Sequence, residues 1–91
     1  MIFDIRYQES VAKDDIPRLD YEWRKKIELA IENKLTTRPD IYGKPLRQSL
    51  KGYRKLRVGD WRVIFRIERN TVKIFAIGHR SLVYKIIRER I

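Results

Sequence analysis

The chain has 91 residues, enough for one small domain over residues 1–91. A hydrophobic content of 43% is sufficient for a folded core, and the lack of cysteine excludes disulfides, thiol catalysis and thiolate metal sites. With 22 basic and 12 acidic side chains, the net charge is +10, above the magnitude of about 2–8 typical of small domains. We therefore expect a polyanionic partner.

The positive charge is concentrated in the second half of the chain. Residues 1–50 hold ten basic and nine acidic side chains, whereas residues 51–91 hold twelve basic and three acidic ones. The anion-binding surface is therefore expected in residues 51–91. Apolar runs are too short to span a bilayer and the N-terminus lacks a signal-peptide core, so we expect a cytoplasmic protein with no membrane partner.

The first half predicts one strand and two helices. Residues 2–7 are β-branched and aromatic, which is typical of a strand. Ser10 is expected to cap a helix over about 10–16 that Pro17 stops. Asp20 is expected to cap a second, amphipathic helix that runs to about Thr37. Residues 41–52 are expected to form a loop, because glycine and proline recur there.

From Tyr53 onward the pattern changes to the period of β-strands. Gly59-Asp60 and Arg69-Asn70 predict two-residue hairpin turns, which would pair Val58 with Trp61 and Ile67 with Val72. This register sorts the side chains onto two faces. The apolar face collects Leu56, Val58, Trp61, Val63, Phe65, Ile67, Val72, Ile74 and Ala76. The mixed face collects Tyr53, Lys55, Arg57, Arg62, Ile64, Arg66, Lys73, Phe75, Ile77 and His79.

The predicted fold class is α+β. We expect a small antiparallel β-sheet with an N-terminal strand, a two-helix hairpin on one face and a short C-terminal helix, in the order β-α-α-β-β-β-α. Ser81 is expected to cap that last helix, with Leu82, Ile86 and Ile87 available for packing. The helices would cover the apolar face and leave the mixed face for a ligand. Arg57 opposite Arg62 is unfavourable for folding alone, so an anionic ligand is expected.

The side-chain inventory allows plain RNA binding or metal-free cleavage of RNA. Asp60, Glu68 and Glu89 do not converge in this arrangement, and the single histidine excludes a histidine-rich zinc site. We therefore expect no metal and no cofactor. RNA carries its own nucleophile, the 2′-hydroxyl, so cleavage needs alignment, a base, an acid and cations. Candidates for the base and the acid are His79, Tyr84 and Lys55.

Two phrases of the sequence resemble a known family. The hairpin LRVGDWRVIF over residues 56–65 and the ending IGHRSLVY over residues 77–84 resemble the RelE/ParE toxin superfamily. An initial strand and a helical hairpin before them extend the resemblance over nearly the whole chain. It implies a toxin of a toxin–antitoxin pair, with a small antiparallel sheet and helices on one face.

The resemblance also implies an activity. Toxins of the RelE branch cut mRNA in the ribosomal A site without a metal ion, through attack by the 2′-hydroxyl. The matching residues of this chain are Lys55, Arg62, Arg80 and Tyr84, and histidine takes part in some relatives, which adds His79. A further lysine that RelE-like enzymes often carry is replaced here by Tyr53. We expect phosphates of the RNA to be held by Lys51, Arg54, Arg57 and Lys73.

The expected partners are therefore the ribosome with its mRNA and a cognate acidic antitoxin that folds on binding. Two other functions stay open. A ParE-like toxin would share the fold and inhibit DNA gyrase without nuclease activity. A passive RNA-binding module would bind in a salt-dependent way and cut nothing.

Overall fold

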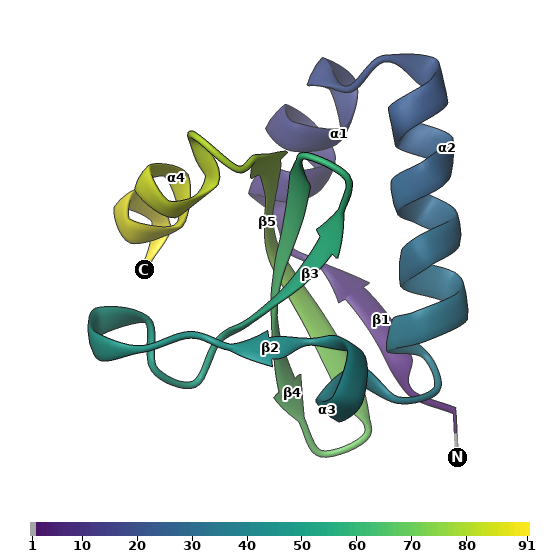
Figure 1. Ribbon diagram of the computed structural model, residues 1–91, viewed down its shortest axis with the longest axis vertical. Helices are drawn as coiled ribbons and strands as arrows, with labels where there is room; N and C mark the ends of the chain where they lie inside the picture. Colours follow the sequence, from purple (N-terminus) through teal and green to yellow (C-terminus); the bar gives the residue numbers. More distant parts are fainter. Residues whose placement is uncertain (1) are drawn as a thin grey trace.

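The computed structural model describes residues 2–91, which form a five-stranded sheet in the order β1-β5-β4-β3-β2 (Figure 1). The strands are β1 (Asp4–Tyr7), β2 (Lys44–Pro45), β3 (Arg54–Val58), β4 (Trp61–Glu68) and β5 (Thr71–His79). Strands β3, β4 and β5 form the predicted meander. The α+β class is confirmed.

The sheet is mixed, whereas the sequence predicted an antiparallel one. Strand β1 pairs with β5 in parallel, with Arg6 opposite Lys73 and Tyr7 opposite Ile74. All other strand pairs are antiparallel. A hairpin turn forces two strands to be antiparallel, but β1 has no turn that joins it to β5, so its direction is not constrained in this way.

The first helical segment is longer than predicted. A π-helical segment over Val11–Asp15 runs directly into α1 (Ile16–Arg18), and Pro17 lies inside this run and does not stop it. The Ile16 N–H bonds to the Val11 carbonyl, five residues back. Proline is tolerated in the first turn of a helical segment, where its missing N–H has little effect. The Ser10 side chain makes no capping hydrogen bond, so that prediction is wrong.

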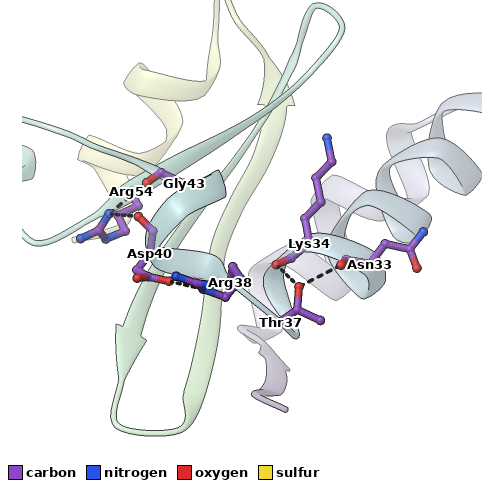
Figure 2. Close-up of polar contacts among 7 residues, drawn as sticks. All are labelled: Asn33, Lys34, Thr37, Arg38, Asp40, Gly43 and Arg54. Carbon is purple, nitrogen blue, oxygen red and sulfur yellow. Dashed lines mark hydrogen bonds and ion pairs between the residues drawn. The ribbon is translucent and has the colours of Figure 1, made fainter. Parts of the chain in front are cut away.

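The second helix follows its prediction closely. Helix α2 (Tyr21–Ala30) begins at Asp20, whose Oδ1 accepts a 3.0 Å hydrogen bond from the Trp23 N–H. It continues as a π-helical segment over Ile31–Leu35. Figure 2 shows how it ends: the Thr37 hydroxyl bonds to the carbonyls of Asn33 and Lys34 at 3.1 and 3.2 Å. These bonds satisfy carbonyls that the last turn leaves without an N–H partner.

The segment predicted as a loop over 41–52 contains short ordered elements. Helix α3 (Pro39–Tyr42) precedes β2, and a 3₁₀ turn over Gln48–Leu50 precedes β3. In residues 2–91, no helix has the length and apolar character needed to cross a membrane.

The main core lies between the apolar face and the N-terminal helices. Helix α2 and the segment around α1 lie on one side of the sheet (Figure 1). Burial of these side chains is the main source of stability. The buried core residues are Val11, Leu19, Ile27, Ile31, Leu35, Leu56, Val63, Phe65, Val72, Ile74 and Ile77.

The mixed face is partly covered, contrary to the expectation that it is left entirely for a ligand. Helix α4 (Val83–Arg90) lies on the side of the sheet opposite α2 (Figure 1). A second buried cluster forms under it from Leu50, Ile64, Ala76, Val83 and Ile87. Helix α4 begins two residues after Ser81, which does not cap it, and Leu82 is exposed.

A bulge in β5 changes the predicted register. Phe65 pairs with Ile74 as predicted, but Ile64 pairs with Ala76, which leaves Phe75 as an extra residue. From this point each residue of β5 changes face. Ile77 therefore enters the main core and Ala76 packs under α4, the reverse of the prediction.

Strand β5 extends past the end of β1, and the backbone of this unpaired part is hydrogen-bonded to a buried ion pair. Asp15 accepts hydrogen bonds from the Ile77 N–H at 2.9 Å and from both terminal nitrogens of Arg90 at 2.7 Å. Arg90 also donates to the Phe75 carbonyl at 3.0 Å. The hydrogen bond to Asp15 is the largest cause of a raised pKa of Arg90. The pair links the N-terminal helices to the end of α4, around the edge of the sheet.

Candidate functional site

The turn between β3 and β4 is a two-residue turn, as predicted, with Val58 opposite Trp61. Gly59 has a φ of 61°, and Asp60 does not have a positive φ, which is the pattern of a type II′ turn. A side chain at Gly59 would meet the Trp23 ring, because an added Cβ would lie 2.6 Å from its Cη2 atom. Helix α2 therefore packs closely against this turn.

Arg62 is held at the same turn. Its side chain emerges from β4 between Arg57 on one neighbouring strand and Gly78 on the other. The residue is only 9% exposed, and its Nη1 atom donates to the carbonyls of Gly59 and Trp61, both at 2.9 Å. Within residues 2–91, Nε and Nη2 donate to no other group. These N–H groups are therefore free to bind an anion.

Arg80 reaches the same turn from the end of β5. Its backbone N–H donates to the Asp60 carbonyl at 2.8 Å, and its Nε lies 3.7 Å from the Asp60 carboxylate. Both side chains are well exposed, so this ion pair is weak and can yield to a ligand. Arg62 and Arg80 therefore both contact the Gly59-Asp60 turn, and Arg57 lies opposite Arg62.

Lys55 and Tyr84 both border the cluster under α4. Lys55 precedes Arg57 by two residues on β3, so the two side chains share the mixed face, and it lies opposite Ile64. Tyr84 lies on α4 and packs, half-buried, against the cluster that contains Ile64. The strand and the helix thus bring a lysine and a tyrosine to the same side of the sheet as Arg62.

The structure places His79 on the apolar face of the sheet, whereas the sequence predicted that it would lie on the mixed face. The bulge pairs it with Trp61 of the apolar face, and the two rings meet edge to face at a centroid distance of 5.7 Å. The Ser81 N–H donates to Nδ1 at 3.2 Å, and the Ser81 hydroxyl lies 2.8 Å from the same atom. A ring nitrogen that accepts a hydrogen bond carries no proton, so the proton of the neutral ring is on Nε2. His79 still adjoins Arg80 in the chain.

Three of the predicted RNA-binding residues lie away from this turn. Arg54 faces α3, where its Nη1 donates to the carbonyls of Asp40 and Gly43 at 3.2 and 2.9 Å (Figure 2). Lys51 is exposed in the loop before β3. Lys73 lies toward the opposite end of the sheet, 3.1 Å from the Glu68 carboxylate. Of the four, only Arg57 lies beside Arg62.

The acidic residues of the basic half do not meet. Asp60 lies at the β3–β4 turn, Glu68 at the end of β4 and Glu89 on α4. Within residues 2–91 no three His, Asp or Glu side chains come together in a way that could hold a metal ion.

A family model described as the ParE toxin of the type II toxin–antitoxin system parDE matches residues 6–84. The chain belongs to the RelE/ParE superfamily of toxins. It is thus a toxin of the type II toxin–antitoxin class, as the motifs of the sequence indicated.

The relatives of this toxin are RelE-like. Toxin RelE of Mycobacterium tuberculosis is 39% identical over 54 residues, which is 57% of this chain. The chain spans 56% of the length of that curated relative. The M. tuberculosis RelBE2 toxin–antitoxin complex contains a chain that superposes with a TM-score of 0.81 and 26% identity, covering 89% of this chain and 94% of that one.

Two structures from Escherichia coli extend the likeness. YafQ superposes with a TM-score of 0.58 at 25% identity, covering 87% of this chain and 94% of that one. A mutant of toxin RelE in the free state superposes with a TM-score of 0.68 at 16% identity, covering all of this chain and 99% of that one. At that identity the match to RelE supports the fold alone.

Proposed function

We propose that this toxin is a metal-independent endoribonuclease that cuts mRNA at the ribosomal A site and so inhibits translation. The observation that carries the proposal is the placement of Arg57, Arg62 and Arg80 at the Gly59-Asp60 turn. Arg57 directly opposite Arg62 destabilises the fold unless an anion neutralises the pair. The RelE-like relatives support the choice of RNA as that anion.

In the proposed reaction the 2′-hydroxyl of the RNA attacks the adjacent phosphorus. A base removes the hydroxyl proton, a bond forms between the 2′-oxygen and phosphorus, and the bond to the 5′-oxygen breaks. An acid protonates the departing 5′-oxygen, which leaves a 2′,3′-cyclic phosphate. Negative charge builds up on the phosphorane oxygens, where preorganised cations lower the barrier most effectively.

The residues divide between charge stabilisation and proton transfer. We assign charge stabilisation to Arg62 and Arg80, because guanidinium groups match the geometry of phosphate oxygens. Lys55 supplies proton transfer or further positive charge. Tyr84 or His79 acts as base or acid, and His79 would act through Nε2. The RNA backbone on either side would be held by Arg57, Lys51 and Lys73, whereas Arg54, expected in the same role, donates to carbonyls beside α3 on the other face.

The proposed partners follow from the charge and from the relatives. An acidic antitoxin segment that folds on binding would neutralise the basic half of the chain. Solved complexes of relatives support this, since RelB–RelE of Methanococcus jannaschii and DinJ–YafQ of E. coli are both antitoxin–toxin pairs. A toxin that cuts mRNA on ribosomes would act in the cytoplasm.

Replacement of Arg62 tests the proposal. Arg62→Ala should lower mRNA cleavage about 10²–10³-fold, the loss typical of one transition-state charge contact. It should abolish growth arrest in cells while antitoxin binding persists. Arg62→Lys keeps the charge and part of the buried stem, so it should retain more activity than Arg62→Ala.

Arg18→Ala is the matched control, because it removes one exposed arginine from α1 on the far side of the sheet. It should leave cleavage and growth arrest unchanged. Full toxicity of a folded Arg62→Ala protein would refute the assignment.

Inhibition of DNA gyrase is a second candidate function, because the matching family model is that of the ParE toxin. Such a toxin would leave mRNA intact and trap gyrase on DNA. A passive RNA-binding module would bind mRNA without cutting it. Cleaved mRNA from induced cells distinguishes the proposed function from both.

A further inference from the structure

Three basic side chains form a row across three adjacent strands, at the end of the sheet away from the Gly59-Asp60 turn. The register places Arg6 of β1 beside Lys73 of β5, and Lys73 beside Arg66 of β4. Because residues in register share a face, all three side chains lie on the mixed face, about 5 Å apart from strand to strand. We call these three residues the cation row.

The carboxylate of Glu68 pairs with two members of the cation row. Glu68 lies 3.1 Å from the Lys73 ammonium and 3.7 Å from Nε of Arg66. Within residues 2–91, Arg6 has no carboxylate partner. Asp4, two residues before Arg6 on the same face of β1, is a second carboxylate near the row. The three basic groups therefore exceed the nearby carboxylates by one charge, and like charges on adjacent strands are unfavourable in the absence of an anion.

The cation row borders an open polar hollow of about 540 Å³. The hollow is lined by Arg6, Glu68, Arg69, Thr71 and Lys73. Arg69 adds a fourth basic group from the β4–β5 turn, where its φ is 58°. Residues other than glycine and asparagine rarely adopt a positive φ. The sequence predicted a positive φ at the following residue, Asn70, and not at Arg69. The residue with the strained backbone is thus a cation that lines a polar hollow.

The cation row and the candidate cleavage site share one face. Arg62 and Arg66 are four residues apart on β4, which corresponds to about 13 Å along the strand. Two aromatic rings lie next to the row: Arg66 stacks over the Tyr53 ring at 5.5 Å, and Phe75 meets that ring edge to face at 5.2 Å. Basic groups alternating with aromatic rings are typical of surfaces that bind single-stranded nucleic acid.

We propose that the cation row, together with Arg69, is a second phosphate-binding site that holds the backbone of the bound RNA strand away from the cleaved bond. The inference rests on the proposed function for the identity of the ligand. The hollow is lined by charged and hydroxyl side chains, so it suits a phosphate backbone better than a peptide, which needs apolar contacts to fold on binding.

Binding of an uncleavable RNA tests the site apart from catalysis. The probe is a short, fluorescent single-stranded RNA with 2′-O-methyl groups throughout, titrated with the full chain at several salt concentrations. The Arg6→Gln, Lys73→Gln double variant should weaken binding by about tenfold at low salt. The slope of log affinity against log salt should become shallower by about 1.4, since each phosphate contact contributes about 0.7.

Two variants predict effects that a merely structural role would not give. Glu68→Gln removes the carboxylate that pairs with Lys73 and Arg66, so it should strengthen RNA binding. Arg69→Gly relieves the backbone strain, so it should leave thermal stability equal or higher while it weakens RNA binding.

The controls carry the same charge changes on α2, which covers the other face. Lys25→Gln with Lys26→Gln matches the double variant, and Glu22→Gln matches Glu68→Gln. Both controls should bind RNA within about twofold of the wild type. The changed charges lie on the other face of the sheet, and dissolved salt screens their interaction with the bound RNA.

The inference is overturned if the double variant binds RNA like its control with an unchanged slope, or if the wild type does not bind the probe. Loss of antitoxin affinity with unchanged RNA affinity would also overturn it and would make the row a protein-binding surface. Failure of the proposed function has a different signature. In that case the wild type would bind the uncleavable probe through the row and yet leave mRNA uncut.

Discussion

Arg62 shows how one residue combines a structural and a chemical task. It is nearly buried, and its Nη1 atom is committed to two carbonyls of the β3–β4 turn. Those bonds fix the guanidinium plane and leave the remaining N–H groups in a defined direction. A fixed cation stabilises a transition state better than a mobile one, because no reorganisation is needed during the reaction.

Gly59 makes this arrangement possible, and its replacement gives a prediction about stability. Gly59→Ala combines a positive φ with a clash against Trp23, so the free energy of unfolding should fall by about 2–4 kcal/mol. Gly52→Ala is the matched control, because its φ of 97° is also positive but no atom lies within 4 Å of an added Cβ. It should cost only about 1 kcal/mol.

Chemical denaturation of both variants measures the difference. Equal losses in the two variants would mean that the contact between Trp23 and the turn does not matter. A larger loss in Gly59→Ala should be accompanied by reduced cleavage, because the Gly59 carbonyl also holds Arg62.

At the level of elements, the position of helix α4 depends on a small buried cluster and on one ion pair. It covers part of the mixed face and carries Tyr84, and the Asp15–Arg90 pair links its end to the N-terminal helices. The carboxylate of Asp15 is 1% exposed and the Arg90 side chain is 20% exposed. Removal of one partner from such a pair leaves a buried charge uncompensated.

Asp15→Asn should therefore lower the free energy of unfolding by about 3 kcal/mol. The amide of Ile77 should exchange with solvent faster, because its hydrogen bond to Asp15 weakens. Asp14→Asn removes an exposed charge that makes no hydrogen bond to Arg90 and raises the pKa of Arg90 less than the hydrogen bond to Asp15 does, so it should change both quantities much less. Unchanged exchange at Ile77 in Asp15→Asn would contradict the role given to the pair.

At the level of the whole molecule, local signals in the sequence predicted the meander and its turns correctly. Gly59 and Asp60 lie between two strands in which apolar and polar side chains alternate, and only one pairing register puts the apolar side chains on one face. Asp20 caps α2, as its position before the helix indicates. The parallel pairing of β1 was not predictable in this way, since no turn joins it to β5. The position of Arg6 beside Lys73 was therefore not predicted either.

The bulge at Phe75 was also not predictable from the sequence. Its effect depends on bonds from the Phe75 carbonyl and the Ile77 N–H to a pair of residues 75 positions apart in the chain. Alternation of side chains carries no information about such a contact. The bulge moves His79 onto the side of Trp61, where it still adjoins Arg80 in the chain.

RNA cleavage at the mixed face is the activity on which the proposed roles of Arg62, Arg80 and the cation row all depend. Primer extension on a translated mRNA, taken shortly after induction of the toxin, tests it most directly. We predict new 5′ ends within the translated region in cells with the wild type, and none with Arg62→Ala. Intact mRNA together with gyrase trapped on DNA would contradict the account.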